Sequence, residues 1–425
     1  MTGTSLGSGA VIGSGSAGAA TWRPIPGGIT APRGMKAGSV IAGLRSRPAP
    51  DVALLAMPDG ASAAGAFTTN QFRAAPVQLS EAALAASGGQ ARAVVVNAGC
   101  ANAGTGPEGL ADAQRVAAAA ARLAGCATGE VLTASTGLIG SRLDADAIER
   151  SLPHLRLSAS RAAGRRAAEA ILTTDTRTKE AALAAELGGR RISVGGMAKG
   201  SGMIHPQMAT MLAFVATDAA VEPGLLAGIL RDAVRDSFNQ ISVDGDGSTN
   251  DTVFLLATGA ADGPSVAEEP AARGFVSDLA AGISAVCRSL AQQIAADGEG
   301  ATRLIEVHVT GAATDDEARL VARGIAASNL VKAAVHGADP NWGRIAAAAG
   351  RSGATLDPAR LGIWIGDQRV FAGEPCAFDR RTATRSLRLR RVGLRVDLGI
   401  GHGAGEAWGC DLSAEYVAIN SEYET

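Results

Sequence analysis

The segment from Lys199 to Leu212 combines a possible nucleophile with a way of activating it. Its sequence, Lys-Gly-Ser-Gly-Met-Ile-His-Pro-Gln-Met-Ala-Thr-Met-Leu, sets Thr210 between the small residue Ala209 and an apolar run over residues 211–216. An internal threonine hydroxyl is a poor nucleophile. Cleavage of the chain before Thr210 would free an α-amino group with a pKa of about 7.7–8.0, which can act as its own general base. The simpler alternative is that Thr210 only begins a core strand after a Gly/Pro turn.

The elements that must position this segment alternate between strands and helices. The apolar run after Thr210 predicts a strand buried on both faces, which would hold a new N-terminus rigidly. Further patterns predict strands at 51–57, 91–97, 130–135, 191–194 and 303–310, and helices at 109–123, 158–172, 222–238 and 271–295. We expect residues 361–399 to be mostly strands, with the arginines of 387–392 on a solvated strand face. This alternation predicts an α/β architecture.

Composition excludes several classes of protein. A net charge of −2 and a pI near 6.3 give no reason to expect nucleic acid or an anionic membrane as a partner. The five cysteines form no Cys-x-x-Cys pair, which argues against a zinc site or a disulfide framework and is typical of a reducing cytoplasm. No uninterrupted apolar run reaches the ~18–20 residues that span a bilayer, and the N-terminus lacks a signal-peptide pattern.

Residues 1–21 are rich in Gly, Ser and Ala, and we expect them to form an extension without fixed structure. They include a formal G-x-G-x-x-G match at 13–18. Because no strand precedes it and Pro24 follows closely, a dinucleotide site is not expected there. Ordered structure should begin near Trp22.

Several motifs in one order resemble the ornithine acetyltransferases, the bifunctional glutamate N-acetyltransferases of arginine biosynthesis. Besides the Lys199–Leu212 segment, the matching motifs cover residues from about 23 to the end. They are Gly27-Gly-Ile-Thr-Ala-Pro-Arg-Gly34, Ala64-Gly-Ala-Phe-Thr-Thr-Asn70, Ala134-Ser-Thr-Gly-Leu-Ile-Gly140, Thr173-Thr-Asp-Thr176, Ser242-Val-Asp-Gly-Asp246, Ser248-Thr-Asn-Asp251, Ala296-Asp-Gly-Glu-Gly300, His336-Gly-Ala-Asp-Pro-Asn-Trp-Gly-Arg344 and Ile419-Asn-Ser-Glu-Tyr-Glu-Thr425.

The resemblance implies a fold and a reaction. The fold would be the layered αββα sandwich that this family shares with self-cleaving aminopeptidases. Cleavage between Ala209 and Thr210 would give an α chain, 22–209, and a β chain, 210–425, which stay interleaved. The enzyme would move an acetyl group from N-acetylornithine to glutamate by a ping-pong mechanism through an acetyl-Thr210 ester. It would be cytoplasmic, without cofactor or metal, and a heterotetramer of two α and two β chains. Use of acetyl-CoA as an additional donor is left open.

The resemblance also assigns residues to roles. Thr210 matches the nucleophile, and Thr136 and Gly137 match the oxyanion hole that stabilises the tetrahedral intermediate. The matching substrate-binding residues are Thr173, Lys199, Thr210, Glu299, Asn420 and Thr425. A lysine suits a substrate carboxylate, and an acid suits a substrate amine. Read without the family, Lys199 is an ordinary loop lysine, Glu299 an acid in a helix-ending turn, and Thr136-Gly137 a strand end.

The sequence leaves other readings open. Asp244, Asp246, Asn250 and Asp251 lack the rest of a calcium loop, so a metal is not expected. The chain departs from the family's usual residues at Cys100, His205 and Gly247, which leaves the acyl acceptor open. Alternatives are therefore a paralogue with a different amino-acid acceptor, a self-cleaving aminopeptidase, and a non-enzymatic binding protein. Peptide turnover would distinguish the second, and an intact Ala209–Thr210 bond would favour the third.

Overall fold

The computed structural model describes residues 20–46, 48–205, 211–261, 263, 266 and 272–422. The predictions for residues 1–19 of the N-terminal extension therefore lie outside the described residues. At the start of the described chain, Trp22 is already buried, and its ring packs against Gly282.

Within the described residues, the first sheet has nine strands, drawn from both sides of position 210. They are β1 (Arg23–Pro24), β2 (Lys36–Val40), β3 (Val52–Phe67), β4 (Gln90–Cys100), β5 (Val131–Leu138), β6 (Lys179–Leu187), β7 (Arg190–Lys199), β8 (Leu212–Thr217) and β10 (Thr252–Ala257). Their order is β1-β6-β7-β8-β10-β3-β4-β5, with β2 paired to β3. The parallel pair β8 and β10 thus lies between strands that all precede residue 206.

This sheet folds over on itself along β3. The first part of β3 pairs with β2 and β4, its last part pairs with β10, and the register to β4 shifts between Ala56 and Ala61. As a result, Phe214 of β8 and Phe254 of β10 share one core with Val94 of β4. Alternate residues of the same strands face outward into two further cores.

Helices cover both outer faces of the folded sheet. On one side lie α5 (Pro223–Arg235) and α6 (Arg273–Ala296), and on the other α2 (Gly106–Ala124) and α3 (Ala145–Ser151). Helices α1 (Ala75–Ser87) and α4 (Arg161–Ala170) also pack on β3 and its neighbours. The layers follow the sequence helix, strand, strand, helix, which confirms the predicted α/β sandwich.

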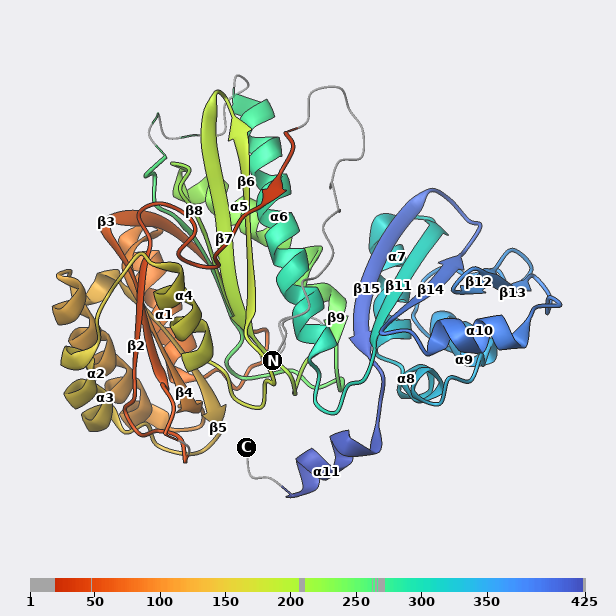
Figure 1. Cartoon of the computed structure of the whole chain (residues 1–425), viewed down its shortest axis with the longest axis horizontal. Coiled ribbons are helices and arrows are strands. Elements are labelled where there is room, and N and C mark those ends of the chain that lie inside the picture. Colours follow the sequence, from red (N-terminus) through yellow and green to blue (C-terminus); the bar gives the residue numbers. More distant parts are fainter. Residues whose placement is uncertain are drawn as a thin grey trace.

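The second sheet is built almost entirely from the C-terminal third of the chain. Its order is β13 (Gln368–Ala372), β12 (Gly362–Ile365), β14 (Arg391–Asp397), β11 (Leu304–Ala312), β15 (Gly403–Cys410) and β9 (Ile241–Ser242). It packs with α7 (Asp315–Ala326), α8 (Asn329–His336), α9 (Trp342–Gly350) and α10 (Arg380–Leu387). Figure 1 shows α6 between the two sheets, and α6 contacts β6 and β7 on one side and β15 on the other.

Most predicted elements are confirmed, with the boundaries given above. The helix predicted over 222–238 ends at Arg235 and is followed by the short 3₁₀ turn Phe238–Gln240. The strand predicted at 51–57 continues to Phe67.

The prediction that 361–399 is mostly strand, with alternation over 387–392, is wrong in part. Residues 380–387 form a helix because the Asp379 carboxylate accepts the Arg381 N–H at its start and Ala383 and Leu387 fall on one buried face. The alternation of exposed and buried residues begins only at Arg391.

Helix α6 has the length and composition of a helix that could cross a membrane. In this fold its apolar residues Leu279, Ile283 and Leu290 are buried in the core against the first sheet. That placement is typical of a core helix, which passes the same test of length and hydropathy.

The last helix, α11 (Ala414–Glu422), stands apart from both sheets (Figure 1). None of its residues is buried. It is joined to the rest of the protein through the Ser413 hydroxyl, which donates to the Gly300 carbonyl, and through Asn420.

Candidate functional site

Two carboxylates hold the chain on either side of residues 206–210. Asp244 accepts the N–H groups of Met203 (2.6 Å) and Ile204 (2.8 Å), and Asp251 accepts the N–H of Met211 (2.9 Å). Ala209 and Thr210, the predicted cleavage residues, lie outside the described residues. Two of the carboxylates weighed above as calcium ligands, Asp244 and Asp251, therefore anchor the chain on either side of the segment that carries the predicted nucleophile. Within the described ranges, no three His, Cys, Asp or Glu side chains cluster as metal ligands would.

Lys199 and Thr136 meet inside the sandwich. Lys199 is the last residue of β7, opposite Leu212, the second residue after Thr210. Its ammonium donates to the Thr136 hydroxyl at 3.1 Å, and each residue is only 2% exposed. This excludes the reading of Lys199 as a solvated loop lysine. A buried ammonium needs a charged or strongly polar partner, which suits the binding of an anionic group here.

Gly137 lies where two strands come close together. It pairs with Gly99 of β4, has a φ of +132°, and a Cβ built on it would lie 2.3 Å from the Gly99 carbonyl carbon. Asn250 stabilises the same strand ends because its amide donates to the carbonyls of Ala101 (2.6 Å) and Ser135 (2.9 Å). The backbone around Thr136 and Gly137 is thus held in one arrangement.

Glu299 reaches the site from the turn after α6. Its Oε2 accepts the Asn420 amide at 2.8 Å, and its N–H donates to the Ser201 carbonyl at 2.9 Å. The carboxylate lies against Gly202, where an added Cβ would come within 2.5 Å of it. Two predicted substrate-binding residues, Glu299 and Asn420, are therefore in direct contact. Thr425, predicted as a third, lies outside the described residues.

Thr173 joins this group through Asp175 rather than directly. Thr173 is exposed, and its backbone N–H donates to Asp175 Oδ2 at 3.0 Å. Asp175 Oδ1 accepts the N–H of Gly200, the residue after Lys199, at 2.7 Å. One buried carboxylate thereby fixes the Thr173 loop against the end of β7.

Burial and charge shift the protonation of three groups here. Burial lowers the pKa of Lys199, although the charges of Asp175, Asp251 and Glu299 oppose that effect. Burial also raises the pKa of Asp251 well above its usual value, and its Oδ2 has no hydrogen-bond partner among the described residues. For Asp175, burial raises the pKa, but the charges of Lys199 and Lys179 outweigh it and hold the pKa at about 2.

The three departures from the family pattern have ordinary surroundings. Cys100 is buried, and its thiol donates to the Ser141 carbonyl at 3.2 Å. His205 is half-buried, with Nδ1 3.3 Å from the Ser242 hydroxyl, and burial lowers its pKa. Gly247 accepts a hydrogen bond from Asn70 through its carbonyl.

Sequence reasoning missed several residues that shape the site, among them Asp175, Lys179, Asp251 and Asn250. Asp175, Asn250 and Asp251 stood within recognised motifs, but the only role weighed for Asn250 and Asp251 was that of metal ligands. The sequence did contain a sign of these residues, because Asp, Asn and Thr are frequent in and beside the matching motifs. Only the folded contacts show which backbone groups these side chains hold.

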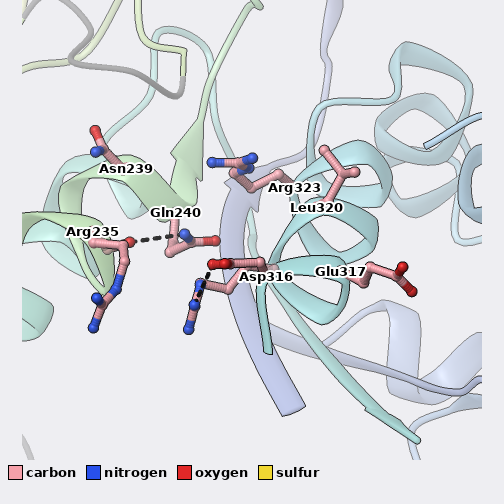
Figure 2. A pocket seen from close by; sticks show the side chains of 8 residues that line it. Arg235, Asn239, Gln240, Asp316, Glu317, Leu320 and Arg323 are labelled. Carbon is pink, nitrogen blue, oxygen red and sulfur yellow. Dashed lines mark hydrogen bonds and ion pairs between the residues drawn. The ribbon is translucent and has the colours of Figure 1, made fainter. Parts of the chain in front are cut away.

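A separate pocket of about 330 Å³ lies between the α5 end and α7 (Figure 2). It includes Arg235, Asp316 and Arg323, and none of the predicted site residues that the structure describes lines it. Arg235 is already paired with Asp232 and Asp236. This pocket is distinct from the group around Lys199.

Comparison with known proteins places the chain in a family. The model of the ArgJ family matches residues 36–425. The arginine biosynthesis bifunctional protein ArgJ of Parasynechococcus marenigrum is 49% identical over 405 residues, which cover 95% of this chain and 97% of that protein. The corresponding protein of Synechococcus sp. is also 49% identical, over 96% of this chain and 99% of its own length.

Solved structures of similar sequence cover about half of the chain. The bifunctional protein ArgJ of Bacillus halodurans is 46% identical over 49% of this chain and 98% of its own, with a TM-score of 0.47. Ornithine acetyltransferase from Mycobacterium tuberculosis, solved with ornithine, is 40% identical over 44% of this chain and 98% of its own, with a TM-score of 0.41. The family model and the curated relatives confirm the resemblance that the motifs indicated. On near-half identity over almost its whole length, the chain belongs to the ArgJ family.

Proposed function

We propose that this protein transfers an acetyl group from N-acetylornithine to glutamate, in arginine biosynthesis, after cleaving itself between Ala209 and Thr210. The observation that carries the proposal is the buried contact of Lys199 with Thr136. Lys199 pairs with Leu212, which lies two residues after Thr210 in the chain. It joins a cation suited to a substrate carboxylate to a hydroxyl suited to an oxyanion. The relatives' names and the solved ornithine acetyltransferase support the substrate class.

The reaction would proceed in two balanced half-reactions. Thr210 Oγ attacks the acetyl carbonyl carbon of N-acetylornithine while the freed α-amine of Thr210 takes the hydroxyl proton. The Thr136 hydroxyl and the Gly137 N–H stabilise the oxyanion. The C–N bond then breaks, the proton passes to the leaving amine, and ornithine departs. The amine of glutamate attacks the acetyl-Thr210 ester by the same steps in reverse, which frees N-acetylglutamate and Thr210.

Substrate recognition falls to residues of both charges. Lys199 would bind a substrate carboxylate, and Glu299, held by Asn420, would bind a substrate ammonium. Thr173 and Thr425 would add further contacts. No metal or cofactor has a step in this scheme, and the place of action we propose is the cytoplasm.

Cleavage would leave two pieces that remain together. Strands β8 and β10 from the β chain lie between β7 and β3 from the α chain, so separation would break two strand interfaces within the first sheet. This strand order supports association of residues 22–209 with residues 210–425. We further propose that two such pairs form a heterotetramer, which sedimentation or light scattering would test.

The test of the proposed function is acetyl exchange by purified protein. N-acetylornithine and glutamate are supplied, and N-acetylglutamate is measured, with Thr210→Ala as the comparison. We expect exchange by the wild type and none by Thr210→Ala. Exchange that survives in Thr210→Ala would show that another group is the nucleophile, and peptide turnover without exchange would favour the aminopeptidase.

The relatives are named bifunctional, which supports a second activity. We propose that this activity is the use of acetyl-CoA as a second acetyl donor. The same assay with acetyl-CoA in place of N-acetylornithine decides this. Offering other amino acids in place of glutamate identifies the acceptor, which the departures at Cys100, His205 and Gly247 left open.

A further inference from the structure

Lysine is rare in this chain and is concentrated in its interior. Of 39 basic residues, only Lys36, Lys179, Lys199 and Lys332 are lysines. Three of these four lysines are at most 2% exposed. Every other Lys or Arg position in the chain carries arginine. Lysine therefore stands where a compact ammonium, rather than a planar guanidinium, fits the surroundings. Lys199 has a role in the proposed function, but Lys179 does not.

Lys179 is the centre of a buried ionic cluster at the start of β6. It has no exposed surface, and its Nζ lies 2.5 Å from Asp175 Oδ1, 2.5 Å from Asp297 Oδ2 and 3.3 Å from the Arg177 carbonyl. All three ammonium protons therefore have acceptors. Both carboxylates are buried as well, with side chains 0% and 3% exposed.

Each carboxylate of the cluster also holds a segment that carries a proposed substrate-binding residue. Asp175 accepts the N–H groups of Thr173 and Gly200. Asp297 accepts the N–H and the hydroxyl of Thr176 and lies two residues before Glu299. The cluster thus connects the segments of Thr173, Lys199 and Glu299, although Lys179 forms its own hydrogen bonds and ion pairs with Asp175, Asp297 and the Arg177 carbonyl. The Ser201 carbonyl completes the connection by accepting the Glu299 N–H.

Two members of the cluster, Asp175 and Lys179, also act on the charge of Lys199. The charged groups that face it are Asp175 from the loop before β6, Lys179 from β6, Asp251 from the loop before β10 and Glu299 from the turn after α6. Asp175, Asp251 and Glu299 favour its protonated form, and Lys179 opposes it. Thr136 of β5 adds a neutral hydroxyl.

We propose that Lys179 is a positioning residue, which acts with Asp175 and Asp297 to align the three substrate-binding segments. The charges of Asp175 and Lys179 also act on the protonation of Lys199. This inference rests on the proposed function, in which Lys199 must be charged to bind a substrate carboxylate. It identifies a control of substrate affinity that lies outside the residues in contact with substrate.

A purely structural role is a weaker explanation of the cluster. Burying charges costs free energy that their attraction barely repays, and apolar replacements of buried ion pairs are often no less stable. A structural cluster also gives no reason for the two carboxylates to hold the backbone of the substrate-binding segments. The two explanations differ in what they predict for Lys199.

The experiment compares Asp175→Asn, Lys179→Met and Lys179→Arg with the wild type. Because the chain has four lysines, selective ¹³C labelling at lysine Cε gives few signals, and the Lys199 signal is assigned with Lys199→Met. Its titration midpoint is read by NMR, and the KM for N-acetylornithine is measured across the same pH range. Arg165→Met, which breaks the exposed Arg165–Glu169 pair, is the matched control.

We expect opposite shifts from the two charge-removing variants. Asp175→Asn removes an anion and should lower the Lys199 midpoint by about one pH unit, so that KM begins to rise at a lower pH. Lys179→Met removes a cation and should move the midpoint upward. Lys179→Arg keeps the charge, so it should leave the midpoint near that of the wild type while raising KM, because the larger guanidinium displaces the segments. Arg165→Met should change neither value.

Two results would overturn the inference. One is a Lys199 midpoint that is unmoved in Asp175→Asn or that moves in the same direction in Asp175→Asn and Lys179→Met. The other is an unchanged KM in Lys179→Arg. If Lys179→Met does not fold, Asp175→Asn and Lys179→Arg still decide. A wild type without acetyl exchange would contradict the proposed function alone, since the NMR titration needs no turnover.

Discussion

Gly137→Ala tests the oxyanion hole most severely. The added Cβ would lie 2.3 Å from the Gly99 carbonyl carbon and 2.5 Å from the Cys100 nitrogen, whereas ordinary contacts begin at 3.4 Å. These neighbours are backbone atoms, so β4 and β5 must separate by about 1 Å. The φ of +132° adds strain for any residue with a side chain. A displacement of ~1 Å at reacting groups costs on the order of 10²-fold, and loss of an oxyanion donor about 10²- to 10³-fold.

We therefore expect kcat for acetyl exchange to fall by at least about 10²-fold, with a loss of roughly 1–3 kcal/mol in the free energy of unfolding. Chemical denaturation and steady-state kinetics measure the two effects on the same preparation. Gly129→Ala is the matched control, because Gly129 lies just before β5 with nothing within 4 Å of its added Cβ. Wild-type kcat in a folded Gly137→Ala protein would refute the assignment of Gly137 to the oxyanion hole.

Three further predictions follow from the site. Lys199→Met removes a charge-assisted hydrogen bond to substrate, worth about 1.5–3 kcal/mol, so KM should rise about 10- to 150-fold; an unchanged KM would assign carboxylate binding elsewhere. Asp251→Asn should stabilise the protein more at pH 8 than at pH 4. Burial raises the pKa of Asp251 in the folded protein, so its contribution to the free energy of unfolding is fully present below its ordinary pKa and is lost as the pH rises through the folded pKa. Asparagine has no charge to bury, so the variant avoids this loss at high pH. Melting temperatures test this, and an equal change at both pH values would contradict it. Gly202→Ala should displace the Glu299 carboxylate, 2.5 Å from the added Cβ, and raise KM with little loss of stability, whereas a wild-type KM would show that Glu299 does not bind substrate.

The layered fold was predictable from the sequence because its strongest signals are local. The strand after Thr210 is apolar on both faces, and β8 is buried throughout because it lies between two other strands and two cores. Helix α10 was missed because its pattern is short and its arginines also fit a strand. The cap at Asp379 and the spacing of Ala383 and Leu387 decide in favour of a helix.

The site was predictable only as a set of residues assigned by resemblance. Nothing in the sequence indicated that Lys199 would be buried against Thr136, since the two lie 63 residues apart and meet only when the sheet folds over along β3. For the same reason the roles of Asp175 and Lys179 could not be anticipated. Their importance depends on the long-range contact of Lys179 with Asp297 and on the contact of Asp175 with Gly200, which no local pattern encodes.

The measurement that tests the central claim most directly is the intact mass of denatured protein after incubation with N-acetylornithine and no acceptor. Our account predicts two fragments, one ending at Ala209 and one beginning at Thr210, with the second heavier by one acetyl group. Addition of glutamate should remove that acetyl group. A single full-length species that exchanges acetyl groups, or an acetyl group on any residue other than Thr210, would contradict the account.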